Sequence, residues 1–179
     1  MKTKINLKAF IGPIGDDLPS LIPIIFALAI FFASFYFAFN SFNAKIKSFD
    51  DDLTVLQIGN TLRGSGFIAD YSQFQEICNG LNVREPKFVA GLIEFKKRST
   101  GGYEGINILE LDKPGSNSEF FKVEEDGKEK KYFCSNTGEL PDLSKALDPT
   151  TRIVFRIYPV VLDYDLSIKP VQLVVVAWR

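Results

Sequence analysis

The sequence predicts an α+β protein: a long N-terminal helix, first transmembrane and then amphipathic, followed by a small antiparallel β-sheet domain. Three observations lead to this expectation. No charged residue occurs between Leu18 and Phe39, and apolar residues beyond Phe39 recur with a helical period. From Lys87 onward the apolar period changes to two, which is typical of strands. A helical part followed by a strand-rich part is the α+β arrangement.

The chain divides into four predicted parts. They are a short basic segment or leader (1–17), a transmembrane helix (18–39), an amphipathic extension (40–66) and an extracytoplasmic α+β domain (67–179). A helix rises about 1.5 Å per residue, so the second part spans roughly 33 Å, enough for the ~30 Å hydrocarbon core of a bilayer. It ends in bulky aromatic residues where a signal peptidase needs small ones, which favours a retained anchor.

Basic residues on the two sides of this apolar run predict its orientation. Three lysines precede it (Lys2, Lys4 and Lys8), and only Lys45 and Lys47 follow closely. Lysine and arginine are retained on the cytoplasmic side. We therefore expect a cytoplasmic N-terminus and a single-pass cell-membrane protein whose C-terminal domain is extracellular.

Beyond the apolar run, bulky apolar residues continue at alternating spacings of four and three. This spacing is the 3.5-residue period of a helix–helix seam. The seam residues are Phe35, Phe39, Phe42, Ile46, Phe49, Leu53 and Leu56. Asn60 takes the next place, and Gly64 and Gly66 are expected to end the helix near Arg63. The stripe predicts bundling with neighbouring copies or partners; the alternative is packing on the chain's own sheet.

The C-terminal part predicts one short helix and several strands. Asp70 or Ser72 caps a helix that ends at Gly80. Asp126-Gly127 marks a hairpin turn, and the last strand is apolar enough to lie centrally. The expected strands are 87–95, 105–111, 120–124, 130–134, 151–162 and 166–178, with a helical turn at Leu143–Leu147.

The two cysteines, Cys78 and Cys134, both follow the apolar run. In an extracellular domain a disulfide between them is permitted, and we expect one. The alternative is a pair of buried free thiols. If formed, the bridge would join the short helix to the sheet.

Composition argues against most catalytic sites. The chain contains no histidine, which excludes Ser-His-Asp and Cys-His nucleophilic sites and most zinc sites. The carboxylates of Asp50-Asp51-Asp52 and Asp163-Tyr164-Asp165 do not converge in the expected elements, so we predict no metal site and no cofactor. The net charge is −1 without a basic face, so no nucleic-acid partner is expected. We predict a protein that is not an enzyme.

The basic start, apolar run, amphipathic continuation and β-rich half together resemble archaeal type IV pilin-like and pseudopilin proteins. In that family a prepilin peptidase removes a short basic leader that ends in a small residue. The resemblance implies cleavage between Gly15 and Asp16. Ile14 stands where the family usually has Lys or Arg, and Ser20 where many pilins have Glu. A non-cleaved or minor component of such a machine fits these residues as well as a filament subunit.

Two functions follow from this sequence. The first is a pilin-like subunit or assembly component that acts by helix bundling and surface contacts, with the lipid bilayer and other copies or pilin-like subunits as partners. The alternative is a monomeric ligand-binding ectodomain, or an accessory subunit of a membrane transport or secretion complex. Oligomeric state and the mass of the mature chain distinguish them.

Overall fold

A computed structural model describes residues 12–96, 100–102, 104–125, 127–138 and 151–179, with side chains from Leu21 onward. The chain forms two compact units, Met1–Ser48 and Phe49–Arg179. Helix α1 (Gly12–Arg63) contributes to both.

In the first unit, the part of α1 from Leu21 to Phe39 has no charged residue on any side. Every side chain from Leu21 to Phe42 is exposed. A helix that is apolar all round needs a surrounding apolar medium, either a protein core or a bilayer. Among the described residues, α1 is the one helix long and apolar enough to cross a membrane, which makes it a candidate single-pass anchor.

In the second unit α1 ends where the sequence predicts. The amide of Gly64 donates to Asn60 O at 3.0 Å, and Gly64 has φ +51°. A left-handed glycine here closes the last turn. Gly66, with φ +89°, then turns the chain into the two-residue strand β1 (Phe67–Ile68).

The main sheet is mixed rather than antiparallel, which corrects the sequence prediction. Its strand order is β1-β6-β7-β2-β5. The remaining strands are β2 (Lys87–Glu94), β5 (Phe133–Ser135), β6 (Ile153–Tyr164) and β7 (Ser167–Trp178). β1 pairs with β6 in parallel, and the other neighbours pair antiparallel. Strand β1 was not predicted, because two residues are too few to show the alternation of a strand.

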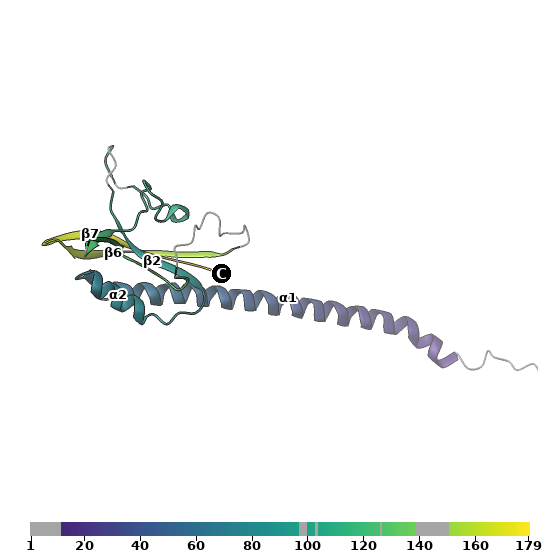
Figure 1. Ribbon diagram of the computed structural model, residues 1–179. Coiled ribbons are helices and arrows are strands. Elements are labelled where there is room, and N and C mark those ends of the chain that lie inside the picture. The colour runs from purple at the N-terminus through teal and green to yellow at the C-terminus, as the bar shows by residue number, and fades with distance from the viewer. Residues whose placement is uncertain (1–11, 97–99, 103, 126, 139–150) are drawn as a thin grey trace, which may run out of the picture. The chain divides into compact units, whose positions relative to one another are not determined.

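Strand β7 lies in the middle of the sheet, as its composition predicts. Its side chains alternate between two cores. Val171, Leu173, Val175 and Ala177 face the helices, and Val174, Val176 and Trp178 face the opposite side. We call these the helix-side and loop-side faces; in Figure 1, α2 and the C-terminal part of α1 lie below the sheet and a long loop lies above it.

Helix α2 (Tyr71–Gly80) covers part of the helix-side face and is tied to the sheet. Asp70 caps it, because its carboxylate accepts from the Gln73 amide at 2.7 Å. The hydrogen bonds from Gln73 and Ser72 lower the pKa of Asp70. Phe74 and Cys78 are buried, and Cys78 forms the predicted disulfide with Cys134 of β5, with a Cα–Cα distance of 5.9 Å.

The segment before Phe120 covers the loop-side face and contains no strand at 105–111, so that prediction is wrong. A short 3-10 helix (Ile108–Glu110) occupies part of it. Its backbone is satisfied locally, because Asn107 N donates to buried Ser118 Oγ and Leu109 N to Asn107 Oδ1. Alternating apolar residues here pack onto the sheet from a loop.

The predicted hairpin around Gly127 is present, as β3 (Lys122–Glu125) and β4 (Lys128–Lys131). Its second strand stops earlier than expected. Tyr132 O accepts from Leu92 N at 2.9 Å, and the next residues pair with β2 as the separate strand β5. The helical turn expected at Leu143–Leu147 lies outside the described residues.

Candidate functional site

The part of α1 in the second unit has apolar residues on two opposite sides. Successive residues turn a helix by about 100°, so a step of two residues reaches nearly the opposite side. Exposed Leu53 lies two residues before buried Val55, and exposed Leu56 lies two residues before buried Ile58. This segment of α1 therefore has one face on the sheet and a second apolar face turned away from it.

The first face is closely packed. Val55, Ile58 and Leu62 are at most 1% exposed and belong to the helix-side core. Gly59 permits a close approach, because a Cβ there would clash with the ring of Tyr158 on β6. These core residues were not singled out from the sequence, although their spacings of three and four are helical.

The second face contains the predicted seam residues of this unit. Phe49, Leu53 and Leu56 are 67, 42 and 38% exposed. The remaining predicted seam residues, Phe35, Phe39, Phe42 and Ile46, lie in the first unit and are also exposed. None of the seven belongs to either described core, so the chain's own sheet is covered by other residues of α1.

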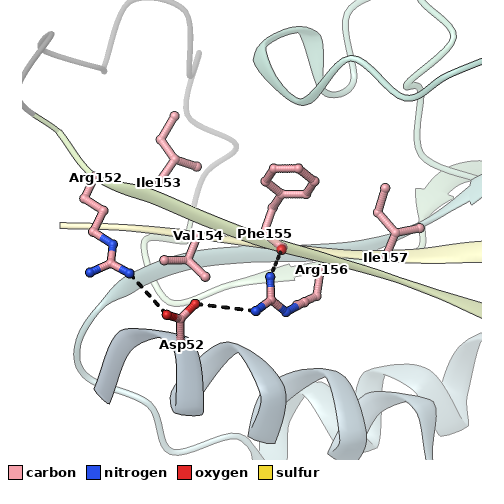
Figure 2. A pocket seen from close by; sticks show the side chains of 7 residues that line it. All are labelled: Asp52, Arg152, Ile153, Val154, Phe155, Arg156 and Ile157. Atoms are coloured by element: carbon pink, nitrogen blue, oxygen red, sulfur yellow. Dashed lines mark hydrogen bonds and ion pairs between the residues drawn. The ribbon is translucent and has the colours of Figure 1, made fainter. Parts of the chain in front are cut away.

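Beside this face, Asp52 lies between two arginines of β6 (Figure 2). Arg152 Nη2 donates to Asp52 Oδ2 at 3.1 Å, and Arg156 Nη2 lies 3.6 Å from Asp52 Oδ1. The three side chains are 36 to 47% exposed. Together with residues Ile153 to Ile157 they line a groove of about 380 Å³. One hundred residues separate Asp52 from Arg152, so no local pattern could have indicated this contact.

The acidic residues noted in the sequence lie apart. Asp50 is exposed, Asp51 is 6% exposed and lies 3.6 Å from Arg179, and Asp52 faces β6. Within the described residues no group of three or more His, Cys, Asp or Glu side chains is placed to hold a metal ion. Among tyrosines, burial raises the pKa of Tyr132 to about 12, and the nearby Asp70 charge adds to this.

The remaining predicted site residues have different outcomes. Cys78 and Cys134 are joined. The backbone of Gly15 and Asp16 lies within α1, and their side chains fall outside the described part.

No protein-family model, curated protein or solved structure matches this chain.

Proposed function

We propose that this chain is a non-enzymatic, single-pass membrane protein that self-associates through the exposed apolar face of α1, in the manner of a pilin-like subunit or assembly component. One observation carries the proposal: Phe49, Leu53 and Leu56 are exposed on the side of α1 opposite its core-facing residues. A helix with two apolar sides is stable in water when both are covered. Burying one such side chain contributes about 1.5–3 kcal/mol.

A second copy is the proposed partner because the same period extends into the first unit. Phe42 and Ile46 continue the spacing toward the apolar part of α1. Copies anchored in one membrane with the same orientation have parallel helices, so equivalent parts of their 3.5-residue seams lie at the same height. Anchoring in a plane also raises the effective concentration of one copy near another.

We propose further that the domain is extracellular and the N-terminus cytoplasmic. The lysine bias before the apolar run supports this orientation. The Cys78–Cys134 disulfide supports it independently, because disulfides persist in oxidising compartments. Protease added to intact cells should digest the domain; complete protection until lysis would reverse the orientation.

The seam is tested with Leu53→Asp in the full chain, reconstituted in lipid nanodiscs and solubilised in mild detergent. We expect oligomers or filaments to disappear while the thermal transition of the domain is unchanged, because Leu53 is outside both cores. Gln57→Asp is the matched control: it adds the same charge to the same helix, at an exposed position outside the seam.

Three outcomes decide the proposal. Loss of assembly in Leu53→Asp but not in Gln57→Asp supports it. Equal assembly in both variants contradicts the seam, and a wild-type chain that is monomeric at every concentration favours the alternative of a monomeric ectodomain or accessory subunit.

The mass of the mature chain separates two forms of the proposal. A mature chain that begins at Asp16 would support a filament subunit, and an intact Met1 would support a non-cleaved component.

A further inference from the structure

The two edge regions of the main sheet differ in what lies beside them. At the β5 edge, Gln75 of α2 donates to Phe133 O at 3.2 Å and the disulfide holds α2 beside the strand. At the other edge, β1 pairs with β6 only at Val161 and Leu162. Among the described residues, the stretch of β6 from Ile153 to Val160 has no strand on its outer side.

The hydrogen-bonding groups at this open edge can be assigned. Val161 N donates outward to Gly66 O at 2.9 Å, and pairing of β6 with β7 is continuous from residue 153 to 164. The N–H and C=O groups of successive residues point to alternate sides of a strand. Since those of Val161 point away from β7, the N–H and C=O groups of the other odd-numbered residues of β6 do so too. Ile153, Phe155 and Ile157 therefore present their N–H groups at the edge. Pro159, also outward, has no N–H to present.

The side chains beside this edge differ between the two faces. On the helix side lie Arg152 and Arg156, which share one carboxylate, Asp52, and so leave a net positive charge. On the loop side lie Phe155 and Ile157, which are 44 and 42% exposed. These side chains line the groove of about 380 Å³ beside Asp52, and Figure 2 shows how they lie along β6. Arg156 Nη1 donates to Phe155 O at 3.1 Å, so this arginine covers one outward carbonyl (Figure 2).

A strand added here would need a defined pattern. Its side chains on the helix side would lie beside the two arginines, and those on the loop side beside Phe155 and Ile157. Opposite charges and apolar pairs across neighbouring strands are stabilising, and like charges are destabilising. Antiparallel pairing of β6 with β6 of a second copy would bring arginines on the helix side close to arginines, which argues against self-pairing.

We propose that the open edge of β6 binds an extended segment of a partner protein in which acidic and apolar side chains alternate. The segment adds a strand to the sheet and makes main-chain hydrogen bonds with Ile153, Phe155 and Ile157. Its acidic residues pair with Arg152 and Arg156. This surface is distinct from the α1 seam, so it serves a second partner.

The test uses the full chain in nanodiscs and fluorescently labelled peptides. The probe is acetyl-Thr-Glu-Val-Glu-Val-Glu-Thr-amide, compared with the peptide that has Lys in place of Glu. A third peptide keeps the acidic side chains but is N-methylated at every residue, which removes the main-chain donors of both its edges. We expect anisotropy to show at least about tenfold tighter binding of the unmethylated acidic peptide than of either other peptide.

Charge-reversal variants locate the binding. Arg152→Glu combined with Arg156→Glu should reverse the preference to the Lys peptide, whereas Arg84→Glu, an exposed arginine elsewhere, should leave it unchanged. Leu53→Asp should retain peptide binding, so failure of the seam and failure of the edge are distinguishable. No binding of the acidic peptide at about 1 mM, equal binding of the methylated peptide, or no response to the double reversal would each overturn the proposal.

Discussion

Val55, Ile58 and Leu62 on one side of α1 are at most 1% exposed, whereas Phe49, Leu53 and Leu56 on the other side are 38 to 67% exposed. Both groups are bulky and apolar, and both recur at helical spacings. The first is covered by the sheet of the same unit. The difference shows that the apolar period of this helix combines two sets of residues, one that the domain buries and one that it leaves exposed, for which we propose a role in association.

The two faces also differ in the residues placed among the apolar ones. The covered face includes Gly59, which allows the Tyr158 ring to approach, and Asp51, which lies near Arg179. These residues interrupt its apolar pattern. The exposed face is uninterrupted from Phe49 to Leu56, and for that reason it gave the clearer period in the sequence. Clarity of a period therefore identifies a helix but not the face that the domain covers.

The largest expected contrast is between charges placed on the two faces. Ile58→Asp puts an unpaired carboxylate into the core and should lower the free energy of unfolding by at least about 4 kcal/mol. Leu53→Asp should change it by less than about 0.5 kcal/mol. The chain's single tryptophan, Trp178, is 6% exposed and reports unfolding in urea. Equal destabilisation by the two variants would mean that the sheet covers both faces.

The disulfide is expected to stabilise the folded domain without affecting the exposed apolar face of α1. Its cysteines are 56 residues apart, for which loop-closure entropy gives about 4 kcal/mol in the simplest account. Cys78→Ser should lower the urea midpoint strongly, and it should leave the proposed association through the exposed face intact in conditions where the domain is folded. Cys134→Ser is the control, because either single variant and the double variant should be equally destabilised. Additive losses would indicate that each side chain acts by packing.

The sequence predicted the parts of this fold that rest on local signals. The end of α1 at Gly64, the Asp70 cap of α2 and the hairpin at Gly127 each depend on a few adjacent residues with defined conformations. The sequence-based prediction failed where contacts between residues distant in the chain determine the local structure. The apolar spacing of residues 105–111 suits a strand, but Ser118 and Asn107 satisfy the backbone as a loop.

The candidate surfaces were predictable to different degrees. The seam residues follow from their period, and the cysteine pair from its even count in a domain expected outside the cell. That the seam lies opposite the sheet depends on which residues of α1 the core accepts, and this is a property of the whole fold. The contact of Asp52 with Arg152 and Arg156 joins elements far apart in the chain, and the open edge of β6 results from the shortness of β1.

A smaller effect is expected from closing the space that Gly59 leaves on the covered face. Gly59→Ala forces its new methyl against the Tyr158 ring and should cost about 1–3 kcal/mol. Tyr158→Leu in the same chain should remove much of that penalty, since the two sites contact each other directly. Asn60→Ala, one residue later and exposed, is the control and should be nearly neutral. Without coupling between the Gly59 and Tyr158 changes, the close approach would have no energetic role.

The smallest effect is expected at the border of the two faces, where Asp52 pairs with Arg152 and Arg156. All three side chains are more than a third exposed, so water and salt weaken the attraction. Asp52→Asn should therefore lower the free energy of unfolding by less than about 1 kcal/mol, and the difference should shrink further in 1 M salt. Urea unfolding at low and high salt measures both quantities. A loss as large as that of Ile58→Asp would place this cluster within the core, whereas a small, salt-sensitive loss leaves its arginines available to an acidic strand.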